Sequence, residues 1–307
     1  VDSDRAEQIE KPIATYLGDG AFTGISHQRD TEQFATSSQS IDVWDHNRAE
    51  PIHSFSWGAD TITACRFNQL EHHIISSLGD DRHICFYDTR SETPIHKLIL
   101  KMKSNSLSWN PMEAFNFSVA NEDHNCYTFD MRRLSAALKV HTDHVAAVLD
   151  IDYSPTGKEF VTGSYDRTIR IFTLDSSRSR EVYHTMRMHR IFSTRFSGDA
   201  SYVLSASEDT NIRVWKSQAA RPIGVLHPRA QKSMEYKEKL KKRYKDMPEI
   251  KRIAGYRHLP KTIKVAKDQQ YAHRKSQQRK EENRIKQSKG KLAKKPLQKQ
   301  PIIEEED

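Results

Sequence analysis

The sequence is poor in the residues that build redox and metal sites. Only three of its 307 residues are cysteines, at positions 65, 85 and 126, and their spacing does not match that of metal ligands. An odd number of cysteines suits a reducing compartment inside the cell. We therefore expect no metal site.

Glycine and long apolar runs are scarce as well. The chain has 11 glycines and no HExxH, CxxC or phosphate-binding loop, because its GSYDRT segment has the composition of a turn. No run of about 18 apolar residues is present, so we expect no membrane span and no membrane partner. These absences predict a protein that is not an enzyme and has no cofactor.

Hydrophobic residues are also few, and charge is unevenly distributed. They make up 36% of the chain, with a mean hydropathy of −0.80, which indicates that part of the chain builds no core. Residues 1–218 hold 23 of the 49 Lys and Arg but 30 of the 41 Asp and Glu, a net charge of −7, whereas residues 219–307 carry +15. A basic segment after a mildly acidic one predicts binding to nucleic acid or another polyanion.

The chain does contain a repeat. Five hydrophobic runs end in an aromatic residue, with steps of 43, 42, 43 and 43 residues, and an aspartate lies six positions before the last four. The aromatic residues are Trp44, Tyr87, Phe129, Phe172 and Trp215. The aspartates are Asp81, Asp123, Asp166 and Asp209. A period of about 40–45 residues with short strands predicts the blades of an all-β propeller.

At this period the chain resembles the WD-repeat family, and Tyr153–Phe172 (YSPTGKEFVTGSYDRTIRIF) matches it best. The resemblance implies that an Asp between the second and third strands of a blade bonds a His before the first. His144 and Asp166 fit these positions as a structural lock; the alternative, a catalytic dyad, lacks a nucleophile at suitable spacing. The aspartates at the matching positions of other units, also candidates for a structural lock, are Asp81, Asp123 and Asp209. These units lack a clear histidine, so other contacts must lock their strands.

The repeats define the expected domain boundaries. A linker at residues 1–11 precedes a propeller at residues 12–228. The repeats lie near residues 12–46, 51–90, 94–133, 137–175 and 181–218. WD-repeat propellers usually have seven blades, so the resemblance predicts that earlier blades precede this sequence; a five-bladed ring is the alternative.

Past Trp215 the strand pattern gives way to helix-forming residues. Pro222–Leu226 is expected to supply one more strand, and apolar residues at helical spacing then predict a helix over residues 229–247, which ends at Pro248. A second helical segment and a long polar helix from Lys261 follow. Residues 291–307 are expected to form a flexible tail.

This C-terminal part resembles the Sof-type domain that follows the propeller in a eukaryotic nucleolar family. The resemblance rests on EYKEKLKKRYKDMPEIKRIAGYRHLPKTI (Glu235–Ile263) and RKEENRIKQSKG (Arg279–Gly290), and we assign the basic helical domain to residues 229–290. The segment between the two blocks matches less well, so contacts there cannot be carried over.

The resemblance implies a function in early small-subunit ribosome assembly. The chain would be a non-catalytic scaffold of the small-subunit processome, located in the nucleus and nucleolus and needed for processing of pre-rRNA. Its implied partners are pre-rRNA, a box C/D small nucleolar ribonucleoprotein and other processome proteins.

Basic side chains of the helical domain are candidates for RNA contact, because Lys and Arg displace counterions from phosphates. Tyr and His in the same segments can stack on exposed bases. The plainer interpretation is a solvated helix face with a nuclear localisation signal in KLKKR, and both functions can coexist. The candidates are Lys239, Lys241, Lys242, Arg243, Lys251, Arg252, Arg257, His258, Arg274, Arg279, Lys280 and Arg284.

An aromatic-Asp-x-Arg pattern occurs twice, 42 residues apart, after the second and third repeats. It resembles the motif by which WD-repeat substrate receptors bind the adaptor of cullin-RING ubiquitin ligases. The resemblance implies an alternative function as such a receptor, with the adaptor as a partner. The docking candidates are Asp88, Arg90, Asp130 and Arg132. The simpler interpretation is that each Asp–Arg pair braces its own loop.

Overall fold

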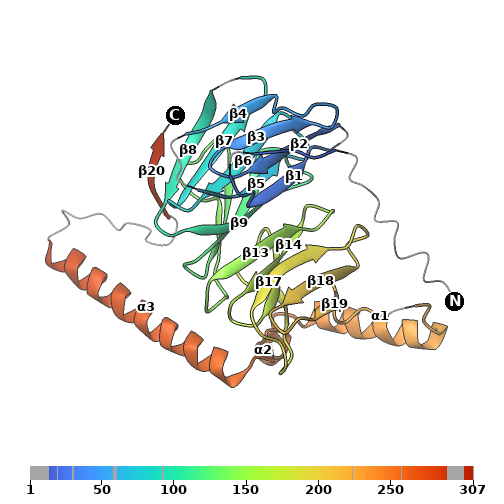
Figure 1. Ribbon diagram of the computed structural model, residues 1–307. Helices are drawn as coiled ribbons and strands as arrows, with labels where there is room; N and C mark the ends of the chain where they lie inside the picture. The colour runs from blue at the N-terminus through green and yellow to red at the C-terminus, as the bar shows by residue number, and fades with distance from the viewer. Residues whose placement is uncertain are drawn as a thin grey trace.

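The computed structural model describes residues 14–18, 20–29, 31–57, 61–91, 93–222, 224–256, 258–288 and 301–306. These residues form five antiparallel sheets in sequence order, then three helices and a last strand (Figure 1). Each sheet is a simple meander, apart from the last strand, which joins the second sheet. This is the all-β propeller with a helical extension that the repeat period predicts.

The strands of the five sheets have the following bounds. The first sheet contains β1 (Gly24–His27), β2 (Gln33–Ser37), β3 (Ile41–Asp45) and β4 (His53–Phe55). The second contains β5 (Ile62–Phe67), β6 (Ile74–Gly79), β7 (His83–Asp88) and β8 (Pro94–Leu100). The third contains β9 (Ser104–Trp109), β10 (Asn116–Asn121), β11 (Cys126–Asp130) and β12 (Lys139–His141). The fourth contains β13 (Val148–Tyr153), β14 (Glu159–Ser164), β15 (Ile169–Thr173) and β16 (Ser179–Tyr183), and the fifth β17 (Ile191–Phe196), β18 (Tyr202–Ser207) and β19 (Ile212–Lys216).

The turn between the second and third strands explains the repeated aspartate. In four sheets the residue after the aspartate has positive φ, between 63° and 67°. In three of these turns the Asp carboxylate accepts a hydrogen bond from the backbone N–H two residues later. Asp forms this local bond readily, and the bond stabilises a tight turn that contains no glycine. The four residues with positive φ are Arg82, His124, Arg167 and Thr210.

The core lies between neighbouring sheets rather than within one. Four clusters of buried apolar residues each combine residues from two consecutive sheets. The first strands β1, β5, β9, β13 and β17 contact one another in that order. The aromatic residue of each repeat lies in the third strand, where Trp44, Tyr87, Phe129 and Phe172 are buried. Each sheet is therefore stabilised by its neighbours, as in a repeat architecture.

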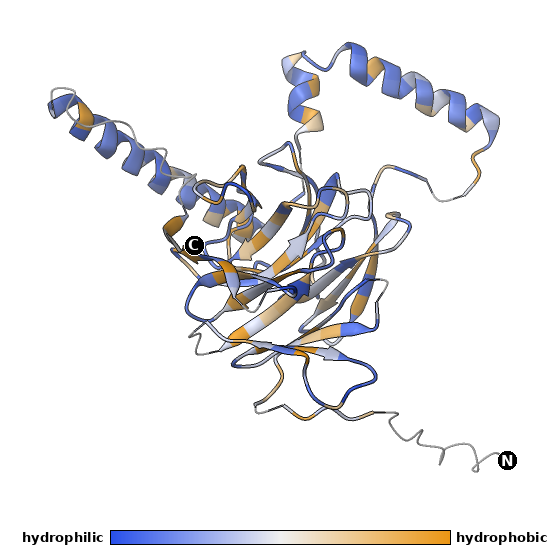
Figure 2. Ribbon diagram, turned by 90° about the horizontal axis from the view of Figure 1, so that it is seen from above, coloured by the Kyte–Doolittle hydropathy of each residue, from blue (hydrophilic) through white to orange (hydrophobic). Residues whose placement is uncertain are grey.

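Three helices follow the sheets: α1 (Pro228–Arg243), α2 (Pro248–Ala254) and α3 (Lys261–Gln287). Figure 2 shows them as mostly hydrophilic ribbons beside sheets with many hydrophobic positions. Among the described helical residues, only Ile263 is buried. No helix in the described ranges is both long and apolar enough to cross a lipid bilayer.

Two expectations about the C-terminal part are wrong. Residues 222 and 224–226 form no strand, because Gly224 adopts a left-handed φ of 88° that interrupts the extended chain. Residues 302–306, expected to be part of a flexible tail, form β20 (Ile302–Glu306), which pairs antiparallel with the outer edge of β8 (Figure 1). Ile302 packs against the core between the second and third sheets, which explains why this end of the chain is ordered. The rest of the expected tail and the linker at residues 1–11 lie outside the described residues.

Candidate nucleic-acid interface

His144 and Asp166 are in contact inside the fourth sheet. His144 Nδ1 lies 3.0 Å from Asp166 Oδ2, and His144 Nε2 lies 2.7 Å from Thr162 Oγ1. Burial alone would raise the pKa of the Asp166 carboxyl, but the neighbouring His144, Arg170 and Thr168 groups outweigh it and hold that pKa below its usual range. Both side chains are almost completely enclosed, so the pair joins two loops and does not reach a substrate.

The other three turn aspartates have no histidine partner. Asp123 accepts hydrogen bonds from the Asn125 N–H and the Tyr127 hydroxyl. Asp209 forms an ion pair with Arg213. Asp81 is exposed and makes no hydrogen bond within the described part of the chain. The histidine lock is therefore found in the fourth sheet, and two of the remaining turns are held by partners from their own third strand.

The loop around His144 also anchors helix α3. Lys267 Nζ forms an ion pair with Asp143 Oδ1 at 2.6 Å, and Gln270 Nε2 donates to the Val145 carbonyl at 3.1 Å. Burial would raise the pKa of Asp143, but Lys267 and the Ser179 N–H lower it overall. The residues on either side of the buried histidine thus hold the helix. Sequence reasoning missed these contacts because Lys267 and Gln270 lie in the weakly matching segment and have the composition of a solvated face.

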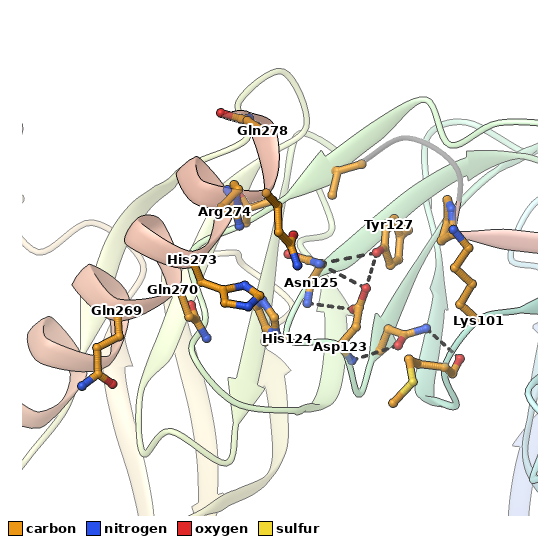
Figure 3. A pocket seen from close by; sticks show the side chains of 16 residues that line it. Lys101, Asp123, His124, Asn125, Tyr127, Gln269, Gln270, His273, Arg274 and Gln278 are labelled. Carbon is orange, nitrogen blue, oxygen red and sulfur yellow. Dashed lines mark hydrogen bonds between the residues drawn. The ribbon is translucent and has the colours of Figure 1, made fainter. Parts of the chain in front are cut away.

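A pocket of about 670 Å³ lies between α3 and the third sheet (Figure 3). One wall is α3, from Gln269 to Gln278, and the opposite wall is the turn Asp123–Asn125 with Tyr127. Lys101, Met102 and Pro301, at the junction of β8 and β20, close a third side. Figure 3 shows His273 and Gln270 projecting from α3 toward this turn, where dashed lines connect Asp123, Asn125 and Tyr127.

The structure leaves most of the expected RNA-contact residues exposed. Arg274 is half-buried and lines the pocket, and Arg284 is paired with Glu281 at 2.9 Å. Arg257 lies outside the described residues. The exposed candidates are Lys239, Lys241, Lys242 and Arg243 in α1, Lys251 and Arg252 in α2, His258 between α2 and α3, and Arg279, Lys280 and Arg284 in α3.

Aromatic and apolar side chains are exposed beside these cations. Tyr236, Met247, Ile253 and Tyr256 each have half or more of their surface exposed. Lys264 Nζ lies 5.7 Å from the centre of the Tyr256 ring. Exposed rings interleaved with Lys and Arg form the kind of surface that can stack on bases while it contacts phosphates.

The two Asp–Arg pairs have the same geometry. Arg90 donates to Asp88 through Nε at 3.0 Å and Nη2 at 2.8 Å, and Arg132 donates to Asp130 at 3.1 and 2.9 Å. The arginine hydrogen bonds lower the pKa of both aspartates. Each arginine side chain is 67% exposed. The pairs therefore brace the ends of β7 and β11 and still present two guanidinium groups on neighbouring sheets.

No group of three or more His, Cys, Asp or Glu side chains that could hold a metal ion is found in the described ranges. Cys65, Cys85 and Cys126 are buried and form no disulfide within the described ranges, and burial raises the pKa of the Cys65 thiol to about 11 and also raises that of the Cys126 thiol. The Cys65 and Cys126 thiols are therefore protonated and unreactive at neutral pH. The exposed polar surfaces therefore remain the candidates for function.

The meander sheets, the regularly spaced turn aspartates and the basic helices after them define a WD-repeat propeller with a helical extension. The family described as WD domain, G-beta repeat matches residues 49–88, 135–173 and 180–216. The family described as Sof1-like domain matches residues 217–302, which include all three helices and the start of β20. The chain is thus a WD-repeat protein with a Sof1-like domain.

Curated relatives match most of the chain. "DDB1- and CUL4-associated factor 13" of Xenopus tropicalis is 50% identical over 272 residues, which are 89% of this chain and 59% of that protein. "Protein SOF1" of Saccharomyces cerevisiae is 48% identical over 267 residues, 87% of this chain and 55% of that protein. The human protein named DDB1- and CUL4-associated factor 13 is 49% identical over 254 residues, 83% of this chain and 57% of that protein. The chain therefore spans somewhat more than half the length of these relatives.

Proposed function

We propose that the chain is a non-catalytic scaffold in ribosome biogenesis that binds RNA through α1, α2 and α3. In this role it is part of the small-subunit processome in the nucleolus, associates with a box C/D small nucleolar ribonucleoprotein and supports processing of small-subunit pre-rRNA. The Sof1-like domain and the similarity to Protein SOF1 support this assignment.

One observation carries the RNA-binding part of the proposal. The helices present a dense set of exposed Lys and Arg, whereas the sheets before them are acidic overall. Among the described helical residues only Ile263 is buried, so packing against the sheets does not explain why the helices carry so many cations. Phosphate contacts of this kind bind with little sequence preference and weaken as salt rises. The propeller would supply rigid loops and faces for protein partners.

The test is to cross-link the protein to RNA in cells and sequence the attached RNA. We expect pre-rRNA and small nucleolar RNA. A matched variant with Lys239, Lys241, Lys242 and Arg243 replaced by Ala, carrying an added nuclear localisation signal, separates RNA contact from import. Equal recovery of RNA by this variant would mean that α1 serves import alone. Recovery of neither RNA class by the unmodified protein would overturn the proposal.

A second candidate function is favoured by the matched Asp–Arg pairs on neighbouring sheets. As a substrate receptor of a cullin-RING ubiquitin ligase, the chain would bind the ligase adaptor through Arg90 and Arg132. The printed name of the vertebrate relatives, which describes association with DDB1 and CUL4, supports this candidate.

Replacing Arg90 and Arg132 together with Ala tests the receptor function. We expect loss of adaptor binding without loss of pre-rRNA processing, which would make the two functions separable. Arg133, which follows the pair at the end of β11, and Arg82, in the turn before β7, are both exposed and supply the control double variant. If the Arg90 and Arg132 variant binds the adaptor like the unmodified chain, the function of the Asp–Arg pairs is limited to bracing their own loops.

A further inference from the structure

We propose that the pocket between α3 and the third sheet binds one unpaired RNA nucleotide. This inference rests on the RNA-binding function proposed above. The helices contact phosphates in that proposal, and the pocket adds a site that contacts a base. It assigns a role to polar residues that lie between the two Sof-type sequence blocks, where Arg274 alone was a candidate for RNA contact.

The pocket has the size of a ligand site and has walls on three sides. Its volume of about 670 Å³ lies within the range of small-molecule pockets in proteins. Its walls come from three parts of the chain that are far apart in sequence: α3, the turn between β10 and β11, and the junction of β8 with β20. Lys267 and Gln270 hold α3 in place at the N-terminal side of the pocket, so the opening is set by anchored elements.

The side chains on α3 divide by face. Gln269, Gln270, His273, Arg274, Gln277 and Gln278 line the pocket, at the spacing of one face of a helix. Lys275, Arg279 and Lys280 do not line it and are exposed. Toward the pocket the helix thus presents amides, an imidazole and one guanidinium, that of Arg274, whereas Lys275, Arg279 and Lys280 lie on its other faces. This division matches a nucleotide whose base enters the pocket while the neighbouring phosphates stay outside.

The chemistry of the lining suits a nucleobase. Asn and Gln amides supply a donor and an acceptor side by side, which pairs with the edge of a base. His124 and His273 provide rings on which a base can stack, whereas Tyr127 is buried behind the turn. Burial and the nearby Arg274 lower the pKa of His124, so its imidazole is neutral near pH 7. Lys101 and Arg274 remain as cations for the phosphate of the bound nucleotide.

The lining disfavours two other occupants. An acidic peptide would meet the Asp123 carboxylate, which faces the pocket with only Lys101 and Arg274 as lining cations. A base inside a duplex is stacked and paired, so its edge cannot enter a pocket, whereas a single-stranded base can be turned out. An unpaired nucleotide therefore fits best.

The test compares two variants of the full chain. His273→Ala with Gln277→Ala changes the pocket and removes no permanent charge; both residues are exposed on a helix, where Ala is well tolerated. Lys275→Ala is the matched control on the outward face. The probes are a fluorescently labelled 12-nucleotide unstructured RNA and a blunt-ended RNA duplex stem with the same number of phosphates, titrated at several salt concentrations.

We expect the pocket variant to bind the unstructured RNA about tenfold more weakly, the effect of losing one stacked base, and to bind the stem as before. The dependence of its affinity on salt should not change. Lys275→Ala should weaken the binding of both RNAs, and for the unstructured RNA it should lower the slope of log affinity against log salt by about 0.7. In addition, 4-thiouridine in the unstructured RNA should cross-link to His124 or His273.

Three results would overturn the inference. If the pocket variant binds both RNAs like the unmodified chain while Lys275→Ala is weakened, the pocket is not used and the RNA-binding function stands. If the pocket variant is weakened equally for both RNAs, its residues act by placing α3 and not by holding a base. If the unmodified chain binds neither RNA, the proposed RNA-binding function fails together with the pocket.

Discussion

The sheets and the helices of this chain use apolar residues in opposite ways. The sheets bury the aromatic residues of four repeats, and every pair of neighbouring sheets shares a core cluster. The described helices bury Ile263 and leave Tyr236 and Ile253 exposed, and Met247 between α1 and α2 is exposed as well. Burial of apolar surface dominates folding energetics, so the sheets are stable through their neighbours, whereas the helices depend on a few polar anchors and on partners.

The largest expected effect is on the stability of the sheets, and one substitution in each region tests it. Phe172→Ala, at a fully buried position, should lower the free energy of unfolding by about 3–5 kcal/mol because it leaves a cavity. Ile253→Ala in α2, at a position that is 71% exposed, should change it by about 0.5 kcal/mol or less. Urea titration followed by tryptophan fluorescence measures both. Similar losses in the two variants would contradict the comparison.

Acid should act on the sheets through Asp166. Its pKa is lowered in the folded chain, so its contribution to stability is present above the unfolded carboxyl pKa of about 3.9 and is lost as the pH falls through the lower folded value. Unfolding free energy should therefore fall below about pH 4, and less steeply in Asp166→Asn. The pKa of Asp143 is also lowered, so the variant Asp143→Asn distinguishes the effect of the α3 anchor on acid stability from that of the His144–Asp166 lock. Identical pH profiles for the unmodified chain and Asp166→Asn would exclude this role.

A smaller effect concerns the anchor of α3. Lys267→Ala removes an ion pair to a buried carboxylate, but Lys267 is 43% exposed, so we expect a loss of about 1 kcal/mol in the local stability of the helix. This corresponds to roughly fivefold faster hydrogen exchange in α3, with the sheets unchanged. Lys275→Ala, on the exposed face, should leave exchange as it is. Unchanged exchange in Lys267→Ala would show that other contacts hold the helix.

The smallest expected effect is at the exposed apolar residues of α1 and its end. Tyr236→Ser with Met247→Ser should leave the thermal midpoint of the isolated chain within about 2 °C, because both side chains are already more than half exposed. Differential scanning calorimetry measures it. A drop of 5 °C or more in the thermal midpoint would show that these two side chains contribute to a packed core. The helices would then be stabilised by apolar burial, as the sheets are.

The sequence predicts the sheets well because each strand carries its own signal. The aromatic residue, the alternating apolar positions and the turn aspartate are local features, and they recur at a fixed period. The His144–Asp166 contact and the two Asp–Arg pairs also follow from short motifs. The partners of Asp123 and Asp209 could have been found in the same way, because Tyr127 and Arg213 lie four residues after them.

The pairing of β20 and the anchoring of α3 could not be predicted, because both depend on contacts between distant parts of the chain. Ile302 pairs with Leu100 about two hundred residues earlier, and nothing in the acidic segment around it marks a strand. Lys267 contacts Asp143, and each residue taken alone has the features of a solvated charge. The strand expected at Pro222–Leu226 failed for a local reason, the left-handed conformation of Gly224.

Strand β20 has a consequence for the order of folding. A growing chain releases β8 long before Ile302, so the edge that β20 occupies stays open while the later sheets and α3 are synthesised. Contacts between residues so far apart in sequence form late, because the entropy of closing the loop opposes them. The pocket wall at Pro301 is completed only at that stage. Pairing of β20 is thus a late step in the folding of this chain, and the pocket stays incomplete until it occurs.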